Sequence, residues 1–485
     1  MKSSFISLFV IFACFFCVFS FSQCKKGELG HDLDDDPDTS AMVTGDKIDF
    51  YLTKGDQSIL FEQQPASVHF MDIDNGYPDI LVDTSKKFQT IDGFGFSLTD
   101  GSAQLIAGLP ESLQLALLQN LFGSGEKDIG ISYLRISIGA SDLSESVYTY
   151  DDMPSGETDV SLTQFDLRKD KSQVIPILQK ILNINPNLQI MGSPWTAPLW
   201  MKDNKNSVGG RLLPEYYGVY AEYFVKYIQA MKTEGIRIDA ITPQNEPLHG
   251  GNNPSMEMSA KEQTDFIKNH LGPAFENAGI DTKIIIYDHN ADRPDYPLTV
   301  LDDGIARKYI DGVAFHLYGG DIGALSAIHS AYPDKNLYFT EQYVSSSGDF
   351  AGDLRWHMKN VIIGSVRNWS RIALEWNLAS DPEYSIHTPG GCTDCKGGVT
   401  IISGFTKNVG YYIVAHASRF VVPGSVRVAS NITGDIHNAA FVRPDGKKVL
   451  IVLNDDDTQQ TFNIDFKRMK ARVTLGGGSV GTFIW

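Results

Sequence analysis

Eight short apolar runs alternate with amphipathic stretches, and this alternation restricts the possible fold more than any other feature of the sequence. The runs are Gly93–Ser97, Tyr133–Ile138, Gln189–Trp195, Ala240–Glu246, Lys283–Asn290, Gly312–Tyr318, Asn336–Tyr343 and Arg371–Leu378. Helical patterns such as Glu215–Glu234 and Ala260–Ala278 lie between them. Parallel strands need a crossover helix between them, so eight such repeats predict an α/β fold, a (β/α)8 TIM barrel.

A doubly wound parallel sheet is the alternative arrangement of such repeats. It would place a glycine-rich phosphate-binding turn after the first strand. The GxGxxG string of this chain, Gly476–Gly481, lies instead near the C-terminus, and no helical pattern follows it. We therefore expect the barrel.

Strand-like segments flank the barrel on both sides. Residues 47–69 alternate between polar and apolar side chains, and turn signals such as Pro444-Asp445-Gly446 separate short apolar runs near the C-terminus. These runs are Val426–Val428, Ala439–Val442, Val449–Leu453, Thr461–Ile464 and Val473–Leu475. This spacing predicts a β-sandwich built from both ends of the chain. We expect its N-terminal strands over 47–84, the barrel over 85–420 and its C-terminal strands over 421–485.

The N-terminus has the layout of a signal peptide. Lys2 precedes an uncharged run, Phe5–Phe21, that is short for a transmembrane helix. Cys24 directly follows the apolar core and precedes polar residues, which resembles a bacterial lipoprotein processing site. We expect a signal peptide over 1–23 and lipidation at Cys24; ordinary secretion with cleavage near Ser22 is the alternative.

The segment after the signal is polar and acidic. Over 24–46 it holds five closely spaced carboxylates, Asp32, Asp34, Asp35, Asp36 and Asp38. Such a segment cannot form a core and predicts a solvated tether. Together with the signal it predicts an extracytoplasmic protein, lipid-anchored to the outer membrane or cell surface, or else secreted or periplasmic.

Once the signal peptide is removed, two cysteines, Cys392 and Cys395, remain within the folded part of the chain. A lone CxxC is half of a zinc site, but the chain has no second pair. A thioredoxin-type site needs a following helix, which Lys396-Gly397-Gly398 disfavours. We expect a short disulfide that pins a loop in an oxidising compartment.

The net charge of the chain disfavours one class of binding partner, nucleic acids. Lys and Arg number 41 against 59 Asp and Glu, a formal net charge of −18. A chain this acidic repels phosphate backbones, so we expect no nucleic-acid partner.

Two glutamates stand where predicted barrel strands end, which is where barrel sites form. Glu246, in Asn245-Glu246-Pro247, ends the fourth run, and Glu341 lies near the end of the seventh. Strands four and seven lie across the barrel mouth from each other. A pair of carboxyls flanking a scissile bond, one protonated and one ionised, is what glycoside hydrolysis requires.

Longer motifs resemble glycoside hydrolase family 30, which includes glucosylceramidases and microbial endo-β-1,6-glucanases. They are Gly93–Asp100 (GFGFSLTD), Leu134–Gly139 (LRISIG) and Ser193–Lys202 (SPWTAPLWMK), beside the two glutamate motifs. The resemblance implies double displacement with retention, Glu341 being the nucleophile and Glu246 the acid and then the base. It also implies a set of sugar-binding residues: Asp100, Trp195, Asn245, His316, Tyr318 and Trp376. Within this set, Tyr318 would donate to Glu341.

The substrate expected from this resemblance is a neutral β-linked glucan. The loop His387–Gly398 looks more like microbial family members than lysosomal glucosylceramidase, which favours an endo-β-1,6-glucanase. Glucosylceramidase, β-glucosidase and β-xylosidase activities are the alternatives, and a non-catalytic surface glycan-binding protein is a further one. A metalloenzyme is disfavoured because the 11 histidines are scattered without an HExxH motif, so we expect no metal and no cofactor.

Overall fold

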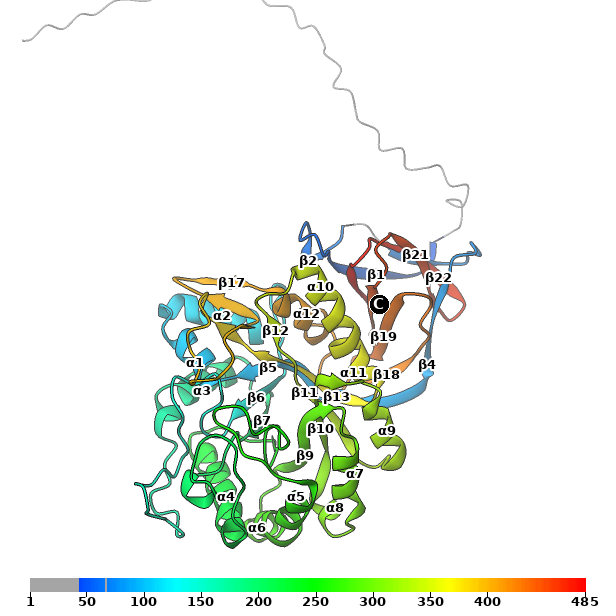
Figure 1. The fold of residues 1–485 in the computed structure, drawn as a ribbon. Helices are drawn as coiled ribbons and strands as arrows, with labels where there is room; N and C mark the ends of the chain where they lie inside the picture. Colours follow the sequence, from blue (N-terminus) through cyan, green and yellow to red (C-terminus); the bar gives the residue numbers. More distant parts are fainter. Residues whose placement is uncertain (1–42, 66–67) are drawn as a thin grey trace, which may run out of the picture. The chain divides into compact units, whose positions relative to one another are not determined.

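The computed structural model describes residues 43–65 and 68–485 (Figure 1). The expected signal peptide, the lipidation site Cys24 and residues 24–42 of the expected tether lie outside the described residues. The first strand, β1 (Val43–Thr53), begins within the range expected for the tether. No helix in the described part of the chain has the length and apolar character needed to span a bilayer.

The predicted barrel is confirmed. Its strands close in the order β10-β11-β13-β5-β6-β7-β8-β9, all pairs being parallel. They are β5 (Gly93–Leu98), β6 (Tyr133–Ser137), β7 (Gln189–Ser193), β8 (Ala240–Ile241), β9 (Lys283–Ala291), β10 (Ile310–Gly320), β11 (Asn336–Glu341) and β13 (Ser370–Asn377). Strand β8 is shorter than its predicted run because Pro243 follows and cannot donate to a ladder.

Helices connect the barrel strands, and a last one, α12, leads from the barrel to the β-sandwich. They are α1 (Asp100–Ala107), α2 (Glu111–Phe122), α3 (Val174–Ile184), α4 (Tyr217–Thr233), α5 (Ala260–Phe266), α6 (Gly272–Ala278), α7 (Asp295–Asp302), α8 (Ala306–Tyr309), α9 (Ala324–Ala331), α10 (Phe350–His357), α11 (Ser365–Arg367) and α12 (Val409–Ser418). The predicted helix over 260–278 is α5 and α6 joined by a π-helical turn, Ile267–Leu271. Ser259 and Glu262 start it with reciprocal capping bonds, which satisfy backbone donors that the first turn leaves unpaired.

Side chains fill the inside of the barrel, so it is a core and not a channel. The buried residues that pack there are Tyr133, Met191, Ala240, Ile285, Ala314, Tyr338, Ile372 and Leu374. Seven of the eight strands contribute them, and the two from β13, Ile372 and Leu374, are two residues apart, as positions that point inward from one strand are. A ligand can therefore enter only at a mouth of the barrel.

Strands from both ends of the chain form the β-sandwich. Figure 1 shows the N-terminal strands in blue beside the C-terminal strands in orange and red. The strand order is β2-β1-β23-β20-β19-β18-β4-β21-β22-β3, and β1 also pairs with β3. Besides β1, these strands are β2 (Leu60–Gln63), β3 (Val68–Met71), β4 (Asp79–Thr90), β18 (Val426–Ser430), β19 (Ile436–Val442), β20 (Lys448–Asn454), β21 (Gln460–Phe466), β22 (Met469–Leu475) and β23 (Val480–Ile484). Strand β4 continues to Thr90, past residue 84 where the sequence placed the end of the N-terminal strands.

Small sheets lie in the loops that follow the last barrel strands. Strand β12 (Val344–Ser345) pairs antiparallel with β15 (Cys395–Lys396). Strands β14 (Ala379–Ser380), β16 (Val399–Ile401) and β17 (Phe405–Lys407) form a second small sheet. These pairings give the loops after β11 and β13 a fixed conformation.

Candidate active site

A cavity of about 270 Å³ opens where the barrel strands end. Its lining comes from the ends of several strands and from the loops after them. The lining residues are Asp142, Trp195, Asn245, Glu246, His249, Asn252, Asn290, Tyr318, Glu341, Tyr343, Trp376, Cys392 and Cys395. Six of the eight residues predicted to act on the sugar are among them, and Asp100 and His316 are not.

Glu246 and Glu341 face one another in this cavity. Glu341 is the last residue of β11, and Glu246 follows β8. One carboxylate oxygen of each lies within 4.8 Å of the other. Both side chains are buried, and Glu246 has a φ of 45°, a strained backbone conformation of the kind found at functional sites. The barrel thus brings together two carboxyls that are 95 residues apart in sequence.

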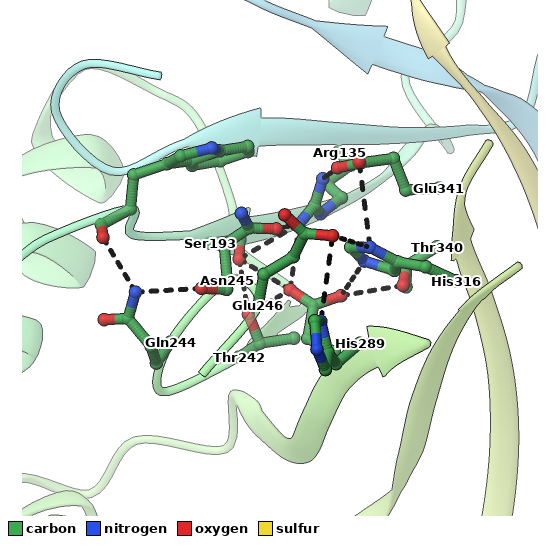
Figure 2. Close-up of polar contacts among 12 residues, drawn as sticks. Arg135, Ser193, Thr242, Gln244, Asn245, Glu246, His289, His316, Thr340 and Glu341 are labelled. Carbon is green, nitrogen blue, oxygen red and sulfur yellow. Dashed lines mark hydrogen bonds and ion pairs between the residues drawn. The ribbon is translucent and has the colours of Figure 1, made fainter. Parts of the chain in front are cut away.

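A buried cation, Arg135 of β6, lies beside Glu341 (Figure 2) and connects it to a third carboxylate, Asp288 of β9. Its Nη1 donates to Glu341 Oε2 at 2.5 Å and its Nη2 to Asp288 Oδ2 at 2.9 Å. Asp288 also accepts hydrogen bonds from Ser193, Thr242 and Thr340. Despite its burial, Arg135, His316 and Thr340 hold the pKa of Asp288 well below its usual range.

His316 of β10 lies between the carboxylates. Its Nε2 is 3.1 Å from Asp288 Oδ1, and its Nδ1 is 3.4 Å from Glu246 Oε1 and 3.7 Å from Glu341 Oε1. Against the effect of burial, the charge of Glu341 and the bonds with Asp288 and Glu246 raise the pKa of His316 to about 10. His316 is therefore a cation at neutral pH.

The pKa values of the two glutamates shift in opposite directions. Burial raises the pKa of Glu341 against the pull of His316 and Arg135, and the charge of Glu246 adds to the rise. Glu246 is also buried, but hydrogen bonds with His289 and His316 lower its pKa. Because the two carboxyls are coupled, they titrate as one unit, and the raised pKa belongs to the pair and not to Glu341 alone.

Aromatic side chains and amides surround the carboxylates. The rings of Trp195 and Trp376 lie 5.4 Å apart and tilted by 33°. The Tyr318 hydroxyl donates to Glu341 Oε1 at 3.0 Å, the contact that the sequence resemblance implied. Asn245 Oδ1 accepts from Arg135 at 2.6 Å, which turns its amide nitrogen toward the cavity that Asn245 lines. The cavity therefore offers apolar walls and a few convergent polar groups, as sugar sites do.

Asp100 lies behind the cavity wall. It is 2% exposed at the start of α1 and accepts a hydrogen bond from Ser144. The aspartate that does line the cavity is Asp142, in the loop after β6. Burial, with the charges of Glu341 and Glu246, raises the pKa of Asp142 to about 7. Asp142 is thus better placed than Asp100 to accept hydrogen bonds from a sugar.

Sequence reasoning missed several residues of this site. Asn252 donates to Glu246 Oε2 at 3.4 Å, and His249, Asn290 and Tyr343 complete the lining. Asp288 could have been selected from the sequence, because it is the one carboxylate inside the apolar run Lys283–Asn290. No such signal marks the loop residues Asn252 and His249.

The charges at the site disfavour a bound metal ion. Glu246, His316 and Glu341 could each offer one ligand atom. However, the Arg135 guanidinium already pairs with Glu341, and His316 carries a proton with a pKa of about 10. Cys392 and Cys395 are joined in a disulfide, so neither sulfur can bind a metal as a thiolate.

The chain is similar to proteins of known type over nearly all of its described length. Residues 91–421 match the Glycosyl hydrolase family 30 TIM-barrel domain, and residues 424–483 match the Glycosyl hydrolase family 30 beta sandwich domain. An endo-1,6-beta-D-glucanase of Trichoderma harzianum is 37% identical over 77% of this chain and 79% of its own length. The lysosomal acid glucosylceramidase of Mus musculus is 30% identical over 84% of this chain and 83% of its own. The solved structure of an endo-beta1,6-glucanase superposes with a TM-score of 0.84 at 34% identity, covering 91% of this chain and 99% of that one.

Proposed function

The chain belongs to glycosyl hydrolase family 30 and is a glycoside hydrolase, and on that premise we propose that it is a retaining endo-β-1,6-glucanase. The observation that carries the mechanism is the short separation of Glu246 and Glu341, whose oxygens approach within 4.8 Å. Retaining enzymes hold their carboxyls about 5–5.5 Å apart, whereas inverting enzymes leave about 6.5–9.5 Å for a water. The substrate follows from the 1,6-glucanases that the chain resembles in sequence and in structure.

In the first step, Glu341 attacks the anomeric carbon while Glu246 protonates the departing oxygen. Arg135 at 2.5 Å and Tyr318 at 3.0 Å stabilise the Glu341 anion. His316 Nδ1, which carries a proton and lies within 3.7 Å of both glutamates, can donate that proton to Glu246 and then accept the proton of the pair from Glu341, so that His316 ends as it began. The sugar then forms an ester with Glu341, and the leaving glucan departs as a neutral alcohol.

In the second step, Glu246 is the base. Having lost its proton, it accepts one from a water that attacks the anomeric carbon, and the ester to Glu341 breaks with a second inversion. The amide of Asn245 is placed to bond the sugar 2-hydroxyl, a contact that strengthens in the transition state. Trp195 and Trp376 flank the sugar ring, and Asp142 accepts hydrogen bonds from the hydroxyls of the sugar.

A substrate panel tests the specificity. We expect pustulan, a β-1,6-glucan, to be cleaved to β-1,6-linked oligosaccharides of mixed length. Laminarin, xylan, glucosylceramide and aryl β-glucosides should be slower, measured as kcat/KM with products resolved by chromatography. Faster cleavage of glucosylceramide, or release of glucose alone from pustulan, would assign one of the alternative activities.

We further propose that the enzyme acts outside the cytoplasm, held to a membrane by a lipid on Cys24. The support is the apolar run Phe5–Phe21, the cysteine directly after it and the acidic segment that follows. We expect the wild-type protein in the membrane fraction of bacterial cells and Cys24→Ala in the soluble extracytoplasmic fraction. Equal distribution of the two proteins would favour ordinary secretion.

A further inference from the structure

The CxxC pair lies in the wall of the candidate sugar site. Both cysteines line the cavity that holds Glu246 and Glu341. Cys395 is 4% exposed and packs in one apolar cluster with Leu143, Trp195 and Trp376, against which Cys392 and Tyr343 also pack. The disulfide between the cysteines is therefore part of the surface that a sugar meets, next to the two tryptophans.

The disulfide loop also contacts other groups of the cavity through its backbone. The Cys392 N–H donates to Asp142 Oδ2 at 3.4 Å. Strand β15 starts at Cys395 and pairs with β12, and β12 begins three residues after Glu341. The Asn377 side chain, next to Trp376, donates to the Cys395 carbonyl at 3.1 Å. A movement of this loop would therefore disturb the cavity wall at Asp142 and beside Trp376.

We propose that the Cys392–Cys395 disulfide is a substrate-binding element that holds one wall of the pocket in its sugar-binding conformation. The covalent link confines residues 392–395 before any ligand arrives, so binding does not have to order them. The inference rests on the proposed function only in taking the ligand to be a sugar. The disulfide, which the sequence predicted only to fix a loop, then also contributes to the affinity for the sugar.

Reduction removes this constraint. A dithiol such as dithiothreitol supplies two electrons and two protons, so the S–S bond breaks, two thiols form and the reagent closes to a cyclic disulfide. Cys392 is half-buried and faces the cavity, which gives the reagent access from the barrel mouth. Arg135 and Glu341 lie on barrel strands and Glu246 lies five residues after β8, all outside the disulfide loop, so affinity should change more than turnover.

The test measures affinity and turnover separately in both redox states. Binding of deoxynojirimycin, a cationic glucose analogue, is followed by calorimetry, and hydrolysis is followed with an aryl β-glucoside. We expect reduction to weaken Kd and raise KM about tenfold while kcat stays within about threefold, because the ordering of the loop is added to binding. The double variant Cys392→Ala/Cys395→Ala should show the weak affinity without reductant and no response to it.

The control is Thr393→Ala, in the exposed position between the two cysteines, which leaves the disulfide intact and should respond to reductant as the wild type does. A lower Tm after reduction with unchanged Kd and KM would overturn the proposal and leave a purely structural staple. If the oxidised enzyme bound deoxynojirimycin but did not cleave β-1,6-glucan, the proposed specificity would fail while the role of the disulfide stood.

Discussion

Replacing Glu341 by glutamine is expected to lower kcat/KM by about 10⁴-fold or more, the scale seen when a covalent catalyst loses its nucleophile. The amide has the same shape, so packing around Arg135 and Tyr318 is preserved. It carries no anionic oxygen, and the ester to the sugar cannot form. Initial rates with an aryl β-glucoside and with pustulan measure the loss.

A matched control uses another buried glutamate of the barrel. Glu375 is bonded to His357 at 2.9 Å and is not among the residues lining the cavity. We expect Glu375→Gln to lower Tm, because it removes a buried charge partner, while kcat/KM stays within about threefold. Near-normal activity of Glu341→Gln would refute covalent catalysis by this residue.

Replacing Glu246 by alanine is expected to have effects that depend on the leaving group. With pustulan or an unactivated glycoside, kcat/KM should fall by about 10²–10⁴-fold, the usual contribution of a general acid. With dinitrophenyl β-glucoside the first step needs no acid, so a burst of phenol should precede slow turnover. Azide, an anion that needs no base, should restore turnover and give the β-glucosyl azide.

The same variant should change the pH profile. In the wild type, kcat/KM falls as pH rises through the upper pKa of the coupled glutamate pair, because no proton is then left for Glu246 to give to the leaving oxygen. In Glu246→Ala the alkaline limb should disappear with the activated substrate. A variant that keeps this limb, or one that azide does not rescue, would assign the acid to another residue.

The barrel strands could be predicted because their signal is local. Each apolar run lies within a few residues of chain, and β5, β6 and β9 begin where their predicted runs begin. Exceptions arise where backbone leaves the ladder, as after Ile241, where Pro243 and the positive φ of Glu246 end β8 early. Glu246 and Glu341 could be selected because strand ends of a barrel converge at one mouth.

The loop residues of the site could not be predicted from a local sequence pattern. Asp100 and Asp142 are both aspartates near the ends of barrel strands, yet only Asp142 lines the cavity. The choice depends on how the loop after β6 packs against the loop after β13, from which the N–H of Cys392 donates to Asp142 across 250 residues of sequence. Contacts at such separations leave no periodic trace in the sequence.

The sequence by itself determined the strand count, the barrel with its sandwich and the two facing glutamates, because hydrophobic periodicity and strand order are properties of nearby residues. Only the tertiary structure decided which groups surround those glutamates. Asp288 and His316 come from neighbouring strands, and the disulfide comes from a loop after β13. Their charges and distances exist only after the barrel has closed, since burial and long-range contacts set both the pKa values and the shape of the pocket.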